Sequence, residues 1–581
     1  MELNSIDYGI MIAFVVISVA IGLYFSDRAS KSVDNFFLGG RNLPWWLAGI
    51  SMVATTFAAD TPLAVTELVV QDGIAGNWLW WNMLAGGMLT TLFFARYWRR
   101  AGILTDLELI ELRYGGMAAR FLRGFRSLYF GVFLNCLIIG WVNLALATLL
   151  TTFFDIPKDE VIGYLFGAMV VVALYSSLSG LLGVVYTDVL QFVIAMAGCI
   201  ILALLVVNSP EVGGMEALKT KLPDGALSFF PKVGGGGSGD TLALGLGSFL
   251  AFMGFQWWAS WYPGNEPGGG GYVAQRMLST KDEKHAVYST LFFQVGHYAL
   301  RPWPWILVAL CAVVLYPELS EEGANSGAGF VMVMRDFLPH GLKGLLIVAF
   351  FAAYMSTIST QLNWGTSYLI NDLYRRFVVP EASQKHLVIA SRLGTVLIMM
   401  VALWFTTKMD SVSGVWKLLV EAGAGLGLVL ILRWYWWRIN AWSEIVATIA
   451  PFLALGFVHL FTDWEFPVSF FFILSFTTVS WVVVTLLTPP EDKGVLLKFY
   501  EKIKPDGWWA PVAGHATLDA SRLGKLLLLW VCGVVMVYST LFAIGGWVLA
   551  EYQQGLQYTG LVIVLLAIFM WLARRVKIFA D

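Results

Sequence analysis

A polar cluster stands in the middle of an apolar segment near the start of the chain. Within Ala54–Pro62, three threonine hydroxyls and the carboxylate of Asp60 come directly before a proline. Because proline cannot donate a backbone hydrogen bond, it frees a carbonyl and weakens the helix. The pattern favours a locally unwound helix whose oxygens suit a small, hard cation. The alternative is a proline kink in which the hydroxyls bond back to the backbone.

A second cluster places four hydroxyls on little more than one helical turn of another apolar segment, at Ser356, Thr357, Ser359 and Thr360. Residues three or four positions apart share a helix face. A ligand set made only of oxygens fits Na⁺ better than a transition metal. The alternative is close helix packing by small residues.

Other ionisable residues also lie in apolar segments, where they are costly and indicate function. These are Asp188, the pair His297 and Arg301, and the pair Lys417 and Glu421, whose spacing of four also fits a structural ion pair. The sequence has no Ser-His-Asp arrangement, zinc-binding HExxH motif or paired CxxC. We therefore expect no enzymatic activity.

The elements that must position these side chains are membrane-spanning helices. Of the 581 residues, 58% are hydrophobic and 13% are charged, whereas soluble domains carry about 25% charged residues. A net charge of −2 indicates no nucleic-acid partner. A span needs about 20 residues. The expected spans, some of them short, are Tyr8–Tyr24, Trp45–Val70, Trp78–Phe94, Leu128–Phe154, Val161–Tyr175, Val184–Val207, Leu242–Tyr262, Val287–Tyr316, Leu342–Leu373, Leu387–Phe405, Val415–Trp437, Trp442–Phe461, Val468–Leu487, Leu526–Val548 and Leu556–Leu572.

The loops predict an orientation. With the N-terminus outside and the C-terminus in the cytoplasm, most of the 37 lysines and arginines fall in cytoplasmic loops, as the positive-inside rule requires. The loop 489–521 predicts an amphipathic helix at the membrane surface. Gly268–Gly271 predicts a break between two helices. We expect a multi-pass protein of the plasma (inner) membrane.

The chain resembles the sodium/solute symporter family, which includes sodium-coupled glucose, proline and sialic acid carriers. The match covers about residues 8–440, and its motifs are specific in combination rather than singly. The segments that carry it are Phe36–Trp46, Ala54–Asp60, Gly183–Gln191, Gln275–Arg276, Ala352–Asn363, Gly425–Gly427 and Trp436–Arg438.

The resemblance implies an all-α, LeuT-like fold of two inverted five-helix repeats, with one extra N-terminal helix and about four C-terminal ones. The implied parts are 1–44 (extra helix and loop), 45–207 (first repeat), 208–241 (extracellular loop), 242–437 (second repeat) and 438–581 (C-terminal helices).

The resemblance also implies two sodium sites between core helices. Site one has the carbonyls of Ala54, Phe57 and Ala353 and the hydroxyls of Ser356 and Thr357. Site two, present in some members, has Asp188, Ser356, Ser359 and Thr360.

The implied solute site lies at mid-membrane and comprises Asp60, Thr61, Trp80, Trp261, Tyr262, His297 and Glu421. The acidic second-helix residue of sugar carriers aligns with Trp80, which argues against plain glucose or galactose. His297 takes the position of a sugar-carrier ligand, and the tryptophans offer stacking faces, so a sugar-like solute is favoured.

We therefore expect Na⁺-coupled symport, with two Na⁺ ions and a small polar solute, by alternating access. The expected partners are the solute, sodium and the bilayer, with no obligatory protein partner. Proton coupling, an amino or carboxylic acid as solute, a cation channel and a transporter-like sensor remain alternatives.

Overall fold

The computed structural model describes residues 3–29, 31–231, 244–321, 323–409 and 411–579. Within these residues the secondary structure is helical, with three isolated β-bridges in place of strands. The expected all-α architecture is confirmed. Residues 232–243, which include the end of the expected loop 208–241 and the first residues of the expected span Leu242–Tyr262, lie outside the described part.

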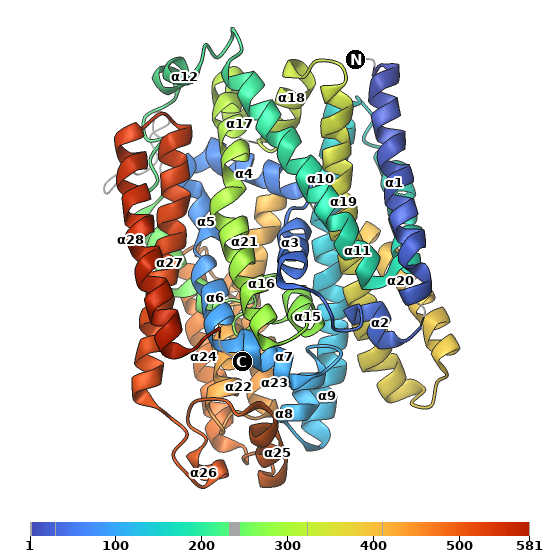
Figure 1. Cartoon of the computed structure of the whole chain (residues 1–581), viewed down its shortest axis with the longest axis vertical. Coiled ribbons are helices and arrows are strands. Elements are labelled where there is room, and N and C mark those ends of the chain that lie inside the picture. Colours follow the sequence, from blue (N-terminus) through green and yellow to red (C-terminus); the bar gives the residue numbers. More distant parts are fainter. Residues whose placement is uncertain (1–2, 30, 232–243, 322, 410, 580–581) are drawn as a thin grey trace.

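Most of the long helices run along the long axis of the molecule (Figure 1). The N-terminal half contains α1 (Ser5–Ala29), α2 (Val33–Leu38), α3 (Trp45–Thr56), α4 (Asp60–Asp72), the 3₁₀ helix η1 (Ile74–Asn77), α5 (Trp78–Trp81), α6 (Leu84–Leu89), the π-helix η2 (Thr90–Phe94), α7 (Ala95–Ala101), α8 (Glu108–Arg113), α9 (Gly116–Leu128), the π-helix η3 (Tyr129–Leu134), α10 (Asn135–Phe153), α11 (Val161–Val207, kinked at Gly180) and α12 (Met215–Lys221).

The second half contains several π-helical turns within its long helices. Its elements are α13 (Leu246–Ala251), η4 (Phe252–Gln256), α14 (Trp257–Ala259), α15 (Gly271–Ser279), α16 (Glu283–Val295), η5 (Gly296–Leu300), α17 (Pro302–Leu315), η6 (Pro317–Ser320), α18 (Ala328–Phe337), α19 (Leu342–Ser367), η7 (Tyr368–Val378), α20 (Gln384–Thr406), α21 (Val412–Ala422), α22 (Leu426–Tyr435), α23 (Ala441–Phe461), α24 (Val468–Leu487), α25 (Lys493–Ile503), α26 (Ala510–Ala513), α27 (Ala520–Val548) and α28 (Tyr552–Val576).

By length and apolar composition, ten of the described helices can cross a membrane, or eleven when α3 and α4 count as one broken span. The protein is thus a multi-pass membrane protein. Four of the fifteen expected spans are interrupted or short, namely Trp78–Phe94, Val161–Tyr175, Leu242–Tyr262 and Val415–Trp437. The larger count and the inverted repeat stay predictions.

The interruptions have local causes. The side chain of Asn82 donates to the carbonyls of Trp78 and Leu79, at 2.8 and 2.9 Å, and competes with the long backbone bond from the Asn82 N–H to Trp78, at 3.4 Å, where α5 ends. Gly425 takes a left-handed conformation, with φ of 91°, between α21 and α22. Since neither break changes the apolar character of its segment, hydropathy alone does not reveal them.

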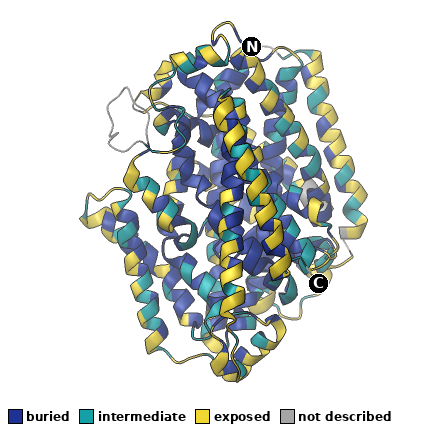
Figure 2. Cartoon of the chain, turned by 60° about the vertical axis from the view of Figure 1, so that its left-hand side comes forward, coloured by how far each residue is buried: buried dark blue, intermediate teal, exposed yellow. Residues whose placement is uncertain are grey.

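Exposed residues follow one face of the peripheral helices, whereas the inner helices are mostly buried (Figure 2). On α1 and α20 the exposed residues are largely apolar, such as Val16 and Leu393. Apolar outward faces of this kind are suited to contact lipid chains.

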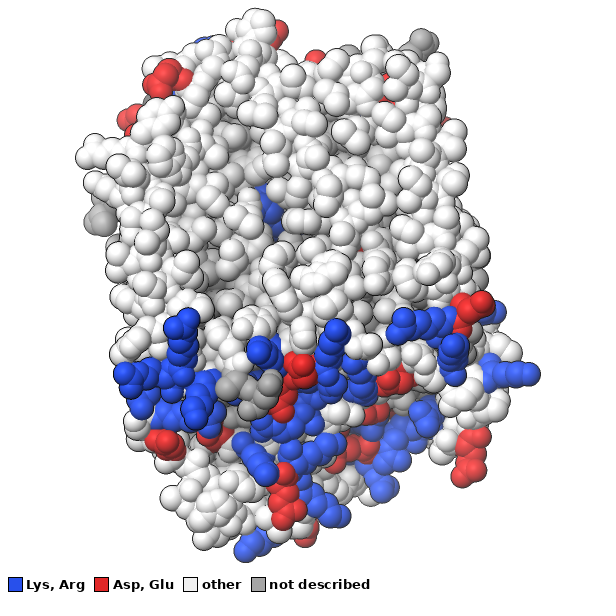
Figure 3. Space-filling view, viewed as in Figure 1, with Lys and Arg blue, Asp and Glu red and all other residues white. Residues whose placement is uncertain are grey.

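Charged side chains gather at the end of the molecule opposite the N-terminus (Figure 3). The expected amphipathic helix forms there as α25, which buries Leu496, Phe499 and Ile503 and exposes Lys498 and Lys502. We refer to this end as the basic end.

Candidate functional site

The expected unwound segment exists between α3 and α4. These helices are bent by 57° at a break formed by Phe57, Ala58 and Ala59. The carbonyls of Val53 and Ala54 both accept the N–H of Phe57 at 3.0 Å, and the end of α3 carries the negative end of the helix dipole. The fully buried guanidinium of Arg301 donates to the carbonyls of Val53 and Thr56, both at 2.9 Å. A side-chain cation therefore stabilises the end of the broken helix.

The hydroxyl-rich turn of α19 packs against this same end of α3. Thr357 donates to the carbonyl of Thr55 at 2.9 Å. Ala54 and Ala353, expected in the first sodium site, are buried, and the carbonyl of Ala54 accepts the N–H of Phe57 at 3.0 Å. The donor set of carbonyls and hydroxyls fits a sodium ion as cargo. The first site therefore has its two helices in contact.

Asp188 on α11 joins the two helices from a third side. Its carboxylate accepts Ser51 of α3 at 2.6 Å and Ser356 of α19 at 2.5 Å, and all three side chains are buried. Asp188 and Ser356, two members of the expected second sodium site, are thus directly bonded.

The other two members of that site are engaged differently. Ser359 donates to the carbonyl of Ser356 at 3.0 Å, while Thr360 accepts Arg276 at 3.0 Å. Arg276 is buried and also donates to Ser51 at 3.3 Å. A guanidinium therefore lies among the oxygens expected to bind a second sodium ion.

Arg276 and Arg301 are residues that the sequence analysis did not assign to the site. Arg301 lies in an expected span, where a cation indicates function, and Arg276 belongs to one of the family-like motifs, so these were the available signals. Their partners on α3 lie 221 to 248 residues away in sequence, and Thr360, which also accepts from Arg276, lies 84 residues away. Only the fold brings them together.

Several expected solute-site residues line one aromatic region. The ring of His297 lies 5.5 Å from Trp80 and 4.4 Å from Tyr298, between centroids. Trp80 stacks on Tyr298 at 5.8 Å. Flat aromatic walls of this kind suit the apolar face of a ring-shaped solute.

Buried polar atoms without partners gather in the same part of the molecule. Among the described residues, no hydrogen bond reaches Asp60 Oδ1, His297 Nδ1, the Tyr298 hydroxyl or Trp416 Nε1. Asp60 interacts electrostatically with Arg301 and Tyr262, and the ring of Tyr262 lies 6.2 Å from Trp416. Because buried polar atoms almost always have partners, this unsatisfied cluster is suited to bind a polar ligand.

The remaining expected solute residues take different places. Thr61 donates to the carbonyl of Thr56 at 3.4 Å, and Trp261 packs on Phe130 with centroids 4.8 Å apart. Glu421 accepts Ser469 of α24 instead of any other expected solute residue. Within the described chain no ion pair forms between Glu421 and Lys417.

The helix break expected at Gly268–Gly271 lies between the solute region and the basic end. The indole of Trp98 donates to the carbonyl of Gly268 at 2.8 Å. At Gly269, which has φ of 83°, an added Cβ would lie 2.4 Å from the same indole nitrogen. Only glycine lets this backbone pass the tryptophan. The break after α14 also pairs with the break after α21, through a bridge between Ser260 and Ala424.

A second polar network lies closer to the basic end, and its charges are matched. Glu444 on α23 accepts Tyr114 at 2.6 Å and is paired with Arg126 and with Arg433 at 3.5 Å. Asp372 on η7 pairs with Arg123 at 2.6 Å. Glu111 on α8 pairs with Arg123 and with Arg376. We call these residues the charge network. It ties α8 and α9 to η7 and α23.

Comparison with known proteins gives the arrangement a context. The model of the sodium:solute symporter family matches residues 36–450. The chain is 25% identical to the sodium/glucose cotransporter of Vibrio parahaemolyticus, covering 84% of this chain and 92% of that protein. It is 24% identical to sodium/glucose cotransporter 1 of Mus musculus, over 80% and 72% of the two chains.

A solved structure of a Na⁺-coupled sialic acid symporter, in a substrate-bound outward-open state, has a similar fold. Its TM-score is 0.68 at 22% identity, and the match covers 84% of this chain and all of that one.

Proposed function

Because this chain belongs to the sodium:solute symporter family, we propose that it carries a small polar solute across the membrane by symport with Na⁺. Members of this family are transporters rather than enzymes, and sodium is the coupling ion. The observation that carries the proposal is the set of unpaired buried polar atoms beside the α3–α4 break.

Coupling follows from the shared contacts of α3 and α19. A sodium ion at the first site takes oxygens from Ala54, Phe57, Ala353, Ser356 and Thr357. The ion thereby holds α3 and α19 together at the helix break. Asp60, the first residue after the break, belongs to the solute region. Each ion that enters down a potential of about 100 mV supplies about 2.3 kcal/mol.

The test is solute uptake by proteoliposomes with an imposed sodium gradient. Replacing Na⁺ by K⁺ or choline at constant pH abolishes uptake, because neither ion fits the site. Ser356→Ala reduces sodium-dependent uptake strongly, since its hydroxyl belongs to both proposed ion sites. Uptake that persists without Na⁺ and follows a pH gradient would instead support proton coupling.

We propose a second sodium ion at Asp188. The support is its buried carboxylate, bonded to Ser356 and Ser51; binding requires Arg276 to withdraw from Thr360. Asp188→Asn lowers the Hill coefficient for Na⁺ from near two toward one, with transport persisting. A wild-type stoichiometry of one Na⁺ per solute contradicts this proposal.

The solute is proposed to be sugar-like. His297, Trp80 and Tyr298 offer a polar tip between flat rings, and a hydroxylated ring can stack on the rings while bonding to Asp60. A thermal-shift screen of sugars, polyols and amino acids in the presence of Na⁺ tests the class. Stabilisation by amino acids alone would assign Asp60 to an ammonium group instead.

The proposed orientation places the basic end in the cytoplasm, in accord with the positive-inside rule. We also propose the five parts given by the resemblance, with the two repeats at 45–207 and 242–437.

A further inference from the structure

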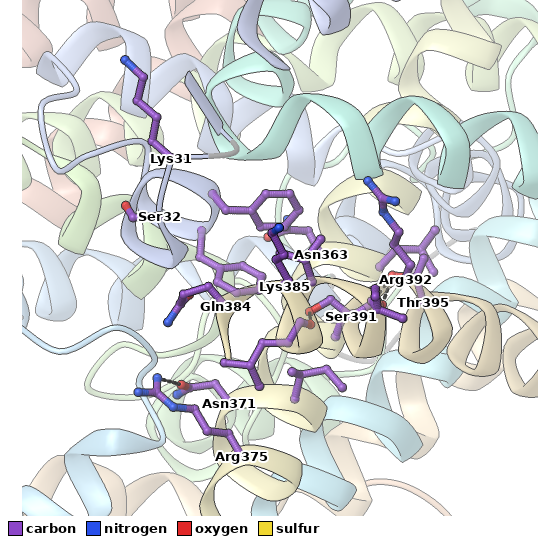
Figure 4. Close-up of a pocket in the computed structure, with 18 of the residues that line it drawn as sticks. Lys31, Ser32, Asn363, Asn371, Arg375, Gln384, Lys385, Ser391, Arg392 and Thr395 are labelled. Carbon is purple, nitrogen blue, oxygen red and sulfur yellow. Dashed lines mark hydrogen bonds between the residues drawn. The ribbon is translucent and has the colours of Figure 1, made fainter. Parts of the chain in front are cut away.

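A cavity lies at the periphery of the molecule, outside the sodium and solute regions. It has a volume of about 460 Å³ and is lined by the end of α1, by α2, by the last turns of α19 with η7, and by α20 (Figure 4). None of the residues expected to bind sodium or solute is among the described residues that line it. The cavity therefore calls for a different ligand.

Cationic side chains surround this cavity without matching carboxylates. The cavity is lined by Lys31 of the turn between α1 and α2, by Arg375 of η7, and by Lys385 and Arg392 of α20. No Asp or Glu is among its described lining residues. Figure 4 shows that these side chains are spread around the hollow. Arg375 makes one long hydrogen bond, to Asn371 at 3.5 Å. The cavity is thus strongly positive.

The rest of the wall is apolar and continues onto the lipid-facing surface. Phe36, Phe37 and Ile370 line its inner side, and Val388 and Ile389 of α20 line its outer side. Ile389 is 59% exposed, and the exposed face of α20 remains apolar farther along the helix. An alkyl chain can therefore leave the cavity along α20 without crossing a polar surface.

We propose that this cavity binds one anionic phospholipid of the leaflet at the basic end. Arg375, Lys385 and Arg392 hold the phosphate of the headgroup, and one acyl chain runs along the apolar wall. Arginine and phosphate form strong, charge-assisted hydrogen bonds. Cations near an anionic membrane surface each contribute about 1 kcal/mol. The site ties α20 and η7 to the connection between α1 and α2.

The experiment is native mass spectrometry of the full chain released from vesicles of phosphatidylcholine alone or mixed with phosphatidylglycerol. We expect one tightly retained phosphatidylglycerol per chain and no comparable phosphatidylcholine. Arg375→Gln with Arg392→Gln weakens retention by about fivefold for each cation lost. The matched control, Lys498→Gln with Lys502→Gln, removes the same charge from α25 and keeps the retained lipid.

Two further arms separate the possible occupants. Ser391→Phe fills the cavity but keeps every cation. If the acyl chain is seated in the cavity, this variant also loses the retained lipid. Inorganic phosphate does not displace the lipid, because it lacks the apolar part. Displacement by phosphate, equal retention of phosphatidylcholine, or equal loss in the α25 control overturns the proposal. Thermal unfolding of each variant verifies that it is folded.

Discussion

The charge network and the solute region are both buried and polar, yet they differ in how well their groups are satisfied. In the charge network Glu444 accepts from Tyr114 and is paired with two arginines. In the solute region, polar atoms of Asp60, His297 and Tyr298 lack partners among the described residues. In the charge network every carboxylate has charged partners, although Nε of Arg126 and of Arg433 makes no hydrogen bond among the described residues. Paired carboxylates are characteristic of a structural lock, and buried carboxylate and hydroxyl oxygens without partners are characteristic of a site whose partner is a ligand.

This difference separates two kinds of mutational effect. Removing one member of a satisfied network leaves a buried charge unpaired, so the cost appears in folding stability. Removing an atom that makes no hydrogen bond leaves no donor or acceptor unsatisfied, so most of the cost appears when the ligand is bound. The predictions below test this separation.

The largest effect is expected from Glu444→Gln in the charge network. The change leaves Arg126 and Arg433 without their buried counter-charge and should destabilise the fold by about 3–5 kcal/mol. Thermal unfolding in detergent measures it. The control is Glu216→Gln, which removes an exposed partner of Lys219 and should cost at most about 1 kcal/mol. If the two variants lower the unfolding temperature equally, the charge network stabilises the fold no more than an exposed ion pair does.

Asp60→Asn is the corresponding change in the solute region. It should raise the half-saturating solute concentration about 10- to 100-fold. This is the change expected from losing a hydrogen bond to a charged group, which contributes about 1.5–3 kcal/mol. The unfolding temperature without solute should stay close to that of the wild type. A loss of stability comparable to that of Glu444→Gln would mean that Asp60 stabilises the fold, as the charge network does, instead of binding solute.

The separation between these regions could be predicted only in part. The break near Asp60 was predictable, because a proline and several hydroxyls in one apolar segment act locally. The fold class and family also followed from composition and motifs. The contacts of Arg276 and Arg301 were not predictable, since they depend on how distant helices pack.

Interrupted helices were missed for a related reason. Segments such as Val415–Trp437 are apolar throughout, but the backbone conformation at Gly425 divides this one into α21 and α22. Hydropathy measures transfer to lipid and contains no information on φ. Glu421 lies near the end of α21, before this break, and accepts Ser469 instead of contacting the other expected solute residues.

Smaller effects are expected at the aromatic walls. His297→Ala and Trp80→Ala should each raise the half-saturating solute concentration about tenfold, or 1.4 kcal/mol, because both rings belong to the aromatic region. Sodium binding in the absence of solute should stay nearly unchanged. Equilibrium binding of solute and of Na⁺, measured separately, tests both variants. The control is Trp404→Ala, which removes an exposed ring on the outer face of α20. If both site variants bind solute like the wild type, the solute region lies elsewhere.

The smallest effect should appear at Glu111, on the outer part of the charge network. Burial raises the pKa of Glu111, but hydrogen bonds from Arg376 and Arg123 outweigh burial and hold it below its usual value. A lowered pKa in the folded state means that the carboxylate stabilises the fold above the unfolded-state pKa, about 4.3 for glutamate. That contribution is lost as the pH falls through the folded-state value. Unfolding temperatures recorded across the acid range should therefore decline less steeply for Glu111→Gln than for the wild type. If the unfolding temperatures of the two proteins decline in parallel, Arg376 and Arg123 do not stabilise the Glu111 carboxylate. The stabilising ion pairs of the charge network would then not extend beyond Asp372.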